Sequence, residues 1–167
     1  MPMITENDAR EVIRLAADAG IAVWLDGGWG IDALMGRQTR PHNDIDIFVQ
    51  RKDADRLVDL LVAKGFAERL MPYTLADHTT WEDKGGRTVD LHVFDFADDG
   101  RIVFLGESYP GEVFSGKGTI GDMPVDCIEP ASQLMFHLGY DHDENDLHDV
   151  LLLCQKYGFD VPDEYLG

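Results

Sequence analysis

Two adjacent glycines, Gly27 and Gly28, constrain this 167-residue chain more than any other feature. They follow an apolar run at residues 22–25, which predicts a strand, and precede residues 29–35, whose spacing predicts a short helix ended by Gly36. Adjacent glycines allow backbone angles and a closeness of approach that side chains prevent. A glycine turn that opens a helix also presents free N–H groups and the positive end of the helix dipole. The pattern therefore predicts a phosphate-binding turn.

The next predicted strand carries two carboxylates on one face. Its residues alternate, so Asp44 and Asp46 point to one side while Ile45, Ile47 and Val49 point to the other. The two acids are about 7 Å apart along the strand, from a rise of roughly 3.3 Å per residue. An isolated Asp-x-Asp is more often a solvated strand face, but this one follows a predicted phosphate turn. Fixed carboxylates in that position are what Mg²⁺ on a nucleoside triphosphate needs, so we predict a metal site here.

A later strand, at residues 88–94, repeats this alternation. Asp90 and His92 share one face, and apolar residues take the other. If this strand lies beside the first, Asp44, Asp46 and Asp90 converge, and their repulsion raises the pKa of one of them until a cation binds. The alternative for Asp90 is a solvated acid on an edge strand.

These motifs resemble a known superfamily. Gly27-Gly28 followed by Asp44-x-Asp46 is similar to the signature of the nucleotidyltransferases related to DNA polymerase β. The fuller string, which spans residues 25–32 and continues with Arg40, His42 and Asp44-Ile-Asp46, resembles the lincosamide nucleotidyltransferases and, more distantly, the aminoglycoside 2″-O-nucleotidyltransferases. The superfamily usually has a serine after the glycines, whose hydroxyl contacts the triphosphate. Trp29 stands there in this chain, so that contact cannot be carried over.

The resemblance implies roles for the acids. Asp44 and Asp46 would hold Mg²⁺, and Asp90 matches the third acidic residue, which in that superfamily lies at the acceptor hydroxyl as a metal ligand or general base. All three are our candidate catalytic and metal-binding residues. His92, two residues later, would position the acceptor substrate or hydrogen-bond a neighbour, and we include it among the substrate-binding candidates.

The nucleotide-binding candidates are Gly27, Gly28 and Arg40. Arginine suits bidentate phosphate contacts, and Arg40 belongs to the family string, although a solvated loop arginine is the alternative. Arg37 is a weaker candidate of the same kind, and His42 is expected to anchor the loop before the acidic strand.

The segment Phe136-His-Leu-Gly-Tyr-Asp141 resembles the C-terminal part of the lincosamide enzymes, which extends the resemblance over about residues 23–149. We therefore predict that Tyr140 and Asp141 bind substrate. The acids that follow, up to Asp149, are either a solvated helix start favoured by the helix dipole or a surface for a cationic substrate.

The order of elements predicts an α+β fold, with helices first, a mixed sheet in the middle and helices last. The resemblance implies the polymerase-β-like nucleotidyltransferase fold. We expect one domain over residues 1–167, with a helical C-terminal portion at about 129–167. Asp53 is expected to cap a helix, Gly85-Gly86 to form a hairpin, and residues 106–118, which lack a clear period, to form a loop that covers the site.

The formal net charge of −18 argues against a nucleic-acid partner, because little offsets phosphate repulsion. It fits an ordinary acidic protein or the attraction of a cationic substrate. No stretch approaches the roughly 20 apolar residues of a membrane span, and residues 1–10 contain no apolar signal region. We therefore expect a cytoplasmic protein without a membrane partner, and a homodimer stays open.

Together these observations predict an enzyme. It would transfer AMP from the co-substrate ATP, with Mg²⁺, to a hydroxyl of a small cationic antibiotic, most plausibly a lincosamide. An aminoglycoside acceptor is the first alternative. The second is of another class, a nucleotide-binding partner protein without turnover, as in antitoxin-like minimal nucleotidyltransferases.

Overall fold

The computed structural model describes residues 3–167, so the first two residues of the N-terminal segment, for which we expect no signal region, lie outside it. The described chain forms a nine-stranded mixed sheet. Its strands are β1 (Val23–Asp26), β2 (Asp44–Gln50), β3 (Ala67–Arg69), β4 (His78–Glu82), β5 (Thr88–Phe96), β6 (Ile102–Phe104), β7 (Glu107–Tyr109), β8 (Gly116–Ile120) and β9 (Met123–Cys127). The main order is β3-β4-β5-β2-β1-β9-β8, and the β6–β7 hairpin extends from β5. Strand β2 runs parallel to β5 and antiparallel to β1.

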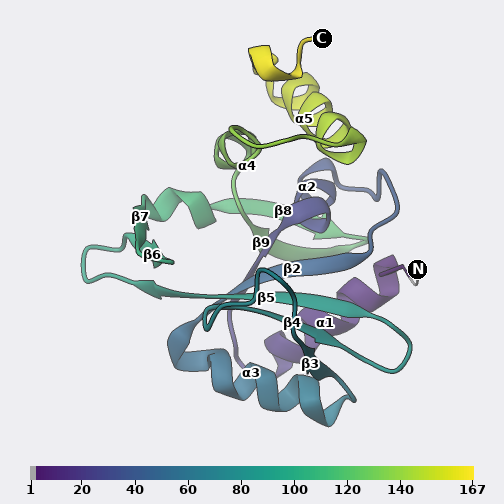
Figure 1. The fold of residues 1–167 in the computed structure, drawn as a ribbon, viewed down its shortest axis with the longest axis vertical. Coiled ribbons are helices and arrows are strands. Elements are labelled where there is room, and N and C mark those ends of the chain that lie inside the picture. The colour runs from purple at the N-terminus through teal and green to yellow at the C-terminus, as the bar shows by residue number, and fades with distance from the viewer. Residues whose placement is uncertain (1–2) are drawn as a thin grey trace.

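Five α-helices and two short 3₁₀ turns complete the described chain. They are α1 (Glu6–Asp18), α2 (Gly27–Met35), α3 (Arg51–Ala63), α4 (Pro130–Phe136), α5 (Glu144–Tyr157), η1 (Gly111–Phe114) and η2 (Asp163–Tyr165). Helices α1 and α3 lie on one side of the sheet, and α2, α4 and α5 lie on the other (Figure 1). The predicted α+β class is confirmed. None of the helices within residues 3–167 has the length and apolar character needed to cross a bilayer.

Local signals in the sequence set most helix ends. Thr5 and Asp8 form a reciprocal capping box at the start of α1, and Gly36 ends α2 in the left-handed conformation. The predicted cap at Asp53 is wrong, because α3 begins at Arg51 and Gln50 is its N-cap residue. Asp53 lies in the first turn instead, where the helix dipole still stabilises a carboxylate.

The prediction of a loop at residues 106–118 is also wrong. This segment contains β7, η1 and the start of β8, and Val113 and Phe114 are buried. Phe114 stacks on Trp24 of β1, with ring centroids 5.0 Å apart. The segment therefore packs into the core and is not an irregular loop. Its elements are only three to five residues long, which is too short to show a period in the sequence.

Two hydrophobic clusters lie on opposite faces of the central strands. The larger one packs Ile45, Ile47 and Val49 of β2 against α1 and α3, as the alternation predicts. The second contains Phe48, Phe94 and Phe114 with residues from β6, β7, η1 and the end of α4. In the C-terminal part of the chain several large apolar side chains are exposed to solvent: Met135, Leu138, Leu147 and Leu151.

Candidate active site

Strand register places two rows of side chains across one face of the sheet. The first, which we call the acidic row, pairs Thr80 with Asp90, Asp90 with Asp46, and Asp46 with Asp26. The second, which we call the aromatic row, pairs His78 with His92, His92 with Phe48, and Phe48 with Trp24. Residues that face each other across neighbouring strands project to the same side, so both rows lie on the face opposite Ile45 and Ile47.

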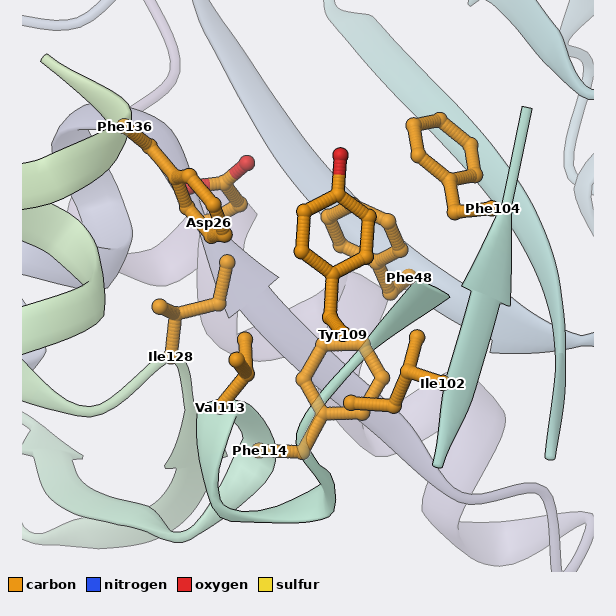
Figure 2. A pocket seen from close by; sticks show the side chains of 9 residues that line it. All are labelled: Asp26, Phe48, Ile102, Phe104, Tyr109, Val113, Phe114, Ile128 and Phe136. Carbon is orange, nitrogen blue, oxygen red and sulfur yellow. The ribbon is translucent and has the colours of Figure 1, made fainter. Parts of the chain in front are cut away.

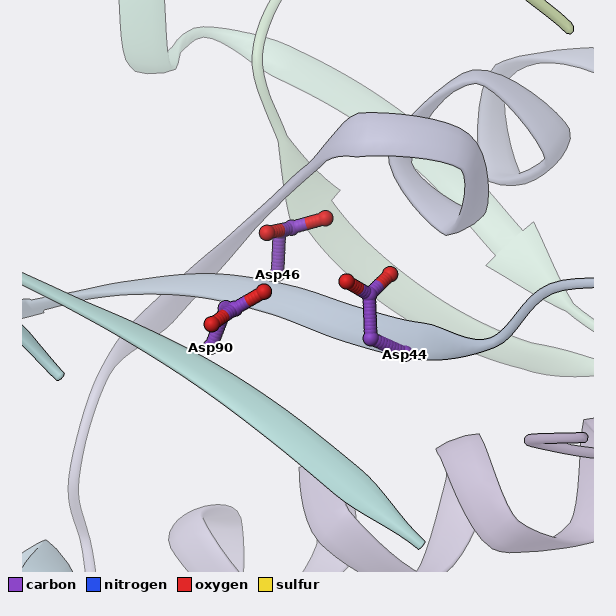
Figure 3. A group of neighbouring side chains, drawn as sticks. All are labelled: Asp44, Asp46 and Asp90. Carbon is purple, nitrogen blue, oxygen red and sulfur yellow. The ribbon is translucent and has the colours of Figure 1, made fainter. Parts of the chain in front are cut away.

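The predicted acidic triad is brought together. Asp44 and Asp46 project from β2 and Asp90 from β5, and one carboxylate oxygen of each lies within 4.8 Å of the others (Figure 3). Burial and the neighbouring charges of Asp46 and Asp90 raise the pKa of Asp44 to about 9. Burial, with the charges of Asp90 and Asp26, raises the pKa of Asp46 well above its ordinary value. A cluster of oxygen ligands whose negative charges repel one another is suited to a divalent cation.

Asp90 is held by two hydroxyl groups that the sequence did not single out. The Thr80 hydroxyl donates a hydrogen bond to Asp90 Oδ1 at 2.6 Å, and the Tyr73 hydroxyl donates to the same atom at 3.2 Å. Both hydroxyls bind Oδ1, and Oδ2 accepts no hydrogen bond from the residues that the structure describes. Thr80 could have been predicted from the sequence, because a hairpin between β4 and β5 places it opposite Asp90 on the same face.

His92 lies beside the triad. Its Nε2 is 3.5 Å from Asp46 Oδ1, and its ring stacks on Phe48 and His78 with centroids 4.7 and 4.3 Å away. Neither ring nitrogen has a hydrogen-bond partner among the described residues. Burial lowers the pKa of His92, so the ring is neutral at pH 7. His92 is therefore an aromatic ring with two buried, unpaired nitrogens next to a carboxylate, and it lines neither of the pockets described below.

Gly27 and Gly28 are required because neighbouring side chains leave no room for a β-carbon at either position. A β-carbon on Gly27, whose φ is +61°, would collide with the carboxylate of Asp46. A β-carbon on Gly28 would lie 2.6 Å from Cε1 of His42 and 2.7 Å from a guanidinium nitrogen of Arg40. Both distances are shorter than carbon contacts allow. The turn therefore brings backbone, carboxylate and guanidinium groups closer than any side chain would permit.

A buried network fixes the loop between α2 and β2. His42 Nε2 lies 2.6 Å from Asp32 Oδ2, and the backbone N–H of Thr39 donates to the same oxygen at 2.9 Å. These bonds offset the cost of burying Asp32 and lower its pKa. Trp29, the residue in the usual serine position, packs on the His42 ring with centroids 4.7 Å apart. His42 thus anchors the loop, as expected, with Asp32 and Trp29 as its supports.

Arg40 lies where the sequence predicts it but is not free. Its Nε and Nη2 donate to the two oxygens of Asp149 in α5, at 3.0 and 2.8 Å. The helix therefore reaches across to the loop and orients the guanidinium group. Arg37 is exposed and lies away from the triad, beside Lys156 of α5.

A polar pocket of about 350 Å³ adjoins the triad. It is lined by Gly27, Gly28, Arg40, His42, Asn43, Asp44, Asp46, His137, Asp143, Asn145, Asp146 and Asp149. The sequence missed His137 and Asn43 as lining residues. Tyr140 and Asp141 line neither this pocket nor the one described next. The Tyr140 hydroxyl instead donates to Asp146 at 2.9 Å, and the predicted roles of Tyr140 and Asp141 in binding stay predictions.

A second pocket, of about 150 Å³, lies over the aromatic row (Figure 2). It is lined by Asp26, Phe48, Ile102, Phe104, Tyr109, Val113, Phe114, Ile128 and Phe136. We call it the aromatic pocket. The two pockets meet at β1, because Asp26 lines one and its neighbour Gly27 lines the other.

A mixed sheet that carries three carboxylates on two adjacent parallel strands, next to a glycine turn that opens a helix, defines a nucleotidyltransferase fold and site. A family model described as aminoglycoside-2''-adenylyltransferase matches residues 8–153, and the chain belongs to that family. The resemblance inferred from the motifs is confirmed.

Individual relatives come from both branches of antibiotic-modifying enzymes. The lincosamide resistance protein of Staphylococcus haemolyticus is 28% identical over 88% of this chain and 92% of its own length. The 2''-aminoglycoside nucleotidyltransferase of Escherichia coli is 26% identical over 70% of this chain and 63% of its own. The lincomycin-bound crystal structure of the lincosamide antibiotic adenylyltransferase LnuA superposes with a TM-score of 0.82 at 27% identity, covering 91% of this chain and 98% of that one. The predicted polymerase-β-like nucleotidyltransferase fold is confirmed.

Proposed function

We propose that this protein transfers AMP from ATP to a hydroxyl group of a lincosamide. The observation that carries the proposal is the position of the triad between a polar pocket with the glycine turn and Arg40, and an apolar pocket next to it. A transferase of this kind needs a charged site for the nucleotide and a different site for the acceptor, both within reach of one reacting phosphorus.

Asp44, Asp46 and Asp90 fit Mg²⁺, because hard divalent cations prefer carboxylate oxygens and these three converge. Burial first, and then the charges of neighbouring carboxylates, raise the pKa of Asp44 and of Asp46, and a bound cation would relieve both effects. When bound, Mg²⁺ would supply positive charge against the triphosphate, which lowers the cost of the charge that develops during transfer.

The residues of the polar pocket would receive the triphosphate. Gly27 and Gly28 start α2, whose free N–H groups and dipole favour anionic oxygens. Arg40 contributes a guanidinium group already oriented by Asp149. Pyrophosphate would leave from this side.

Asp90 would act at the acceptor. The acceptor oxygen forms a bond to the α-phosphorus of ATP, the bond from that phosphorus to pyrophosphate breaks, and the hydroxyl proton passes to Asp90. Thr80 and Tyr73 hold Oδ1 of Asp90 and leave its second oxygen for this contact. His92 would position the acceptor through a ring nitrogen that has no protein partner.

An aminoglycoside acceptor is the alternative, favoured by the acids of α5 that line the polar pocket. Those acids already have partners, however. Asp149 binds Arg40, Asp143 caps the helix, and Asp146 accepts from both Tyr140 and the Asp143 backbone. A substrate with several ammonium groups would have to replace these bonds, whereas a lincosamide carries one amine and an apolar body. The match to the lincosamide resistance protein also covers more of both chains.

The test is incubation with ATP, Mg²⁺ and lincomycin, clindamycin, kanamycin or tobramycin at matched concentrations, followed by mass spectrometry for a nucleotide adduct. We expect AMP adducts on lincomycin and clindamycin, and none with Asp46→Asn. Adducts on the aminoglycosides alone would reverse the choice of acceptor. No adduct on any of the four, with ATP still bound, would favour the non-catalytic partner protein. The homodimer and the single-domain organisation stay predictions, and sedimentation of the purified protein tests the first.

A further inference from the structure

Asp26 carries a carboxylate that has no hydrogen-bond partner among the described residues. It occupies the N-cap position of α2, where an aspartate normally accepts a hydrogen bond from the first turn, but its side chain makes no capping bond. Across residues 3–167 its oxygens form no other side-chain hydrogen bond or ion pair. The side chain instead lines the aromatic pocket, in which every other lining residue is aromatic or aliphatic.

The pocket has an apolar floor and a partly polar mouth. Phe48, Ile102, Val113, Phe114 and Ile128 are buried, while Phe104, Tyr109 and Phe136 are partly exposed. Figure 2 shows the Asp26 carboxylate and the Tyr109 hydroxyl directed toward the same side of the pocket, away from Val113 and Phe114. An apolar cavity of about 150 Å³ has room for a group of roughly the size of benzene.

The pocket lies beside the predicted reaction centre. Asp26 is paired with Asp46 across β1 and β2, and Phe48 follows Asp46 by two residues on the same face. The distance between the two rows is about 7 Å along the strand. A molecule that fills the pocket therefore extends to the triad within a few bond lengths.

We propose that the aromatic pocket and Asp26 select the acceptor, by taking an apolar arm of the substrate into the pocket and pairing its single ammonium group with the Asp26 carboxylate. The inference rests on the proposed transfer reaction and assigns to these residues the acceptor binding that we predicted at Tyr140 and Asp141. An amphiphilic monocation satisfies both the apolar floor and the carboxylate. A polycation does not, because its further ammonium groups would lose water against Phe104 and Phe136 without gaining partners.

The first experiment measures equilibrium binding of clindamycin by calorimetry, without ATP or metal. Asp26→Asn keeps the shape of the side chain and removes its charge, and we expect it to raise the Kd about tenfold, as for the loss of one ionic hydrogen bond. Phe104→Ala should raise the Kd by a similar factor through lost apolar contact. Asp59→Asn, which removes an equal charge from the exposed surface of α3, is the matched control and should leave the Kd unchanged. Melting temperatures identify any variant that has lost its fold.

The outcomes separate this inference from the proposed function. Failure to form any adduct would remove the transfer reaction but leave the binding experiment valid. Unchanged clindamycin affinity in both Asp26→Asn and Phe104→Ala, or a loss seen only with Asp141→Asn, would overturn the inference even if AMP transfer occurs. In turnover assays, Asp26→Asn should raise the KM for clindamycin and leave the KM for ATP within about twofold, because Asp26 does not line the polar pocket. A larger effect on ATP would place Asp26 with the nucleotide instead.

Discussion

The acidic row and the aromatic row lie about 7 Å apart on the same strands, from two residues of strand rise, but they are enclosed differently. Asp46 and Asp90 belong to β2 and β5, the two central strands with the most extensive pairing, and Thr80 on β4 fixes Asp90 from the third. The aromatic row is covered by elements outside the main sheet: the β6–β7 hairpin, η1 and the end of α4. The comparison suggests that the central strands determine the reaction and that the added elements determine the acceptor. Variants of Asp44, Asp46 and Asp90 should then change kcat, and variants of residues that line the aromatic pocket, Asp26 included, should change the KM for the acceptor.

The largest effect is expected from removing a metal ligand. Asp44→Asn or Asp46→Asn should lower kcat by at least ~10³-fold, because a neutral amide is a poor ligand for Mg²⁺ and the charge opposite the triphosphate is lost. Pyrophosphate release with saturating ATP measures the effect, and circular dichroism checks the fold. Turnover near the wild-type value in either variant would mean that the reaction centre lies elsewhere.

A smaller but still large effect is expected at Asp90. Asp90→Asn should reduce kcat by roughly 10²- to 10⁴-fold with little change in the KM for ATP, since its main contact would be with the acceptor hydroxyl. Thr80→Val removes only the hydrogen bond that orients Asp90 and should reduce kcat less. If Asp90→Asn weakens ATP binding alone, Asp90 belongs with the nucleotide and the division between the two rows is lost.

His92 tests the boundary between the rows, because it belongs to the aromatic row and lies next to Asp46. His92→Ala should lower kcat/KM for the acceptor by about 10²-fold or less, as for a positioning group. His92→Phe keeps the stacking on Phe48 and His78 and removes both nitrogens. We expect both variants to lose similar activity. Full activity in His92→Phe would show that the ring contributes packing only.

The smallest effect is on stability in the absence of metal. The pKa of Asp44 is raised from 3.8 to about 9 in the folded protein, so folding favours its protonated form. Its contribution to stability is complete below pH 4 and is lost as the pH rises toward 9. Asp44→Asn should therefore melt higher than the wild type at pH 8, by roughly 2–8 °C for about 1–2 kcal/mol of relieved repulsion and desolvation.

The two proteins should melt at nearly the same temperature at pH 4. At pH 8, added Mg²⁺ should raise the melting temperature of the wild type but not that of Asp44→Asn. Thermal scans with a chelator at both pH values make the measurement. A wild type that is as stable as Asp44→Asn at pH 8 without metal would contradict the crowding of charges in the triad.

The part of the site that the sequence predicted is the part built by local rules. Alternation in β2 and β5 identifies which side chains share a face, and the parallel pairing of these strands brings Asp90 to Asp46. The start of the last helix also follows a local rule, since Asp143 forms a capping box with Asp146 at the beginning of α5.

The rest depends on contacts between distant segments. Asp26 has the sequence position of an ordinary helix cap, and nothing local indicates that its side chain lines an apolar pocket instead. The sequence around Arg40 indicates no partner for its guanidinium group. Asp149 lies 109 residues later in the chain and contacts Arg40 only when α5 packs against the loop. Phe114 in η1 stacks on Trp24 of β1, a contact between distant segments that no local pattern around β7 and η1 predicts.

The alternation of side chains in β2 also limits where the chain can accept insertions and deletions. A shift of β2 by one residue relative to β1 and β5 would turn Asp44 and Asp46 toward α1 and α3 and expose Ile45 and Ile47. Burying two unpaired carboxylates would cost several kcal/mol each, which is comparable to the whole stability of a domain. Asp44 and Asp46 thereby disfavour misaligned strand pairings as the sheet forms. Insertions and deletions should accordingly be tolerated in the exposed part of the preceding loop, near Arg37, and eliminated within the strand itself.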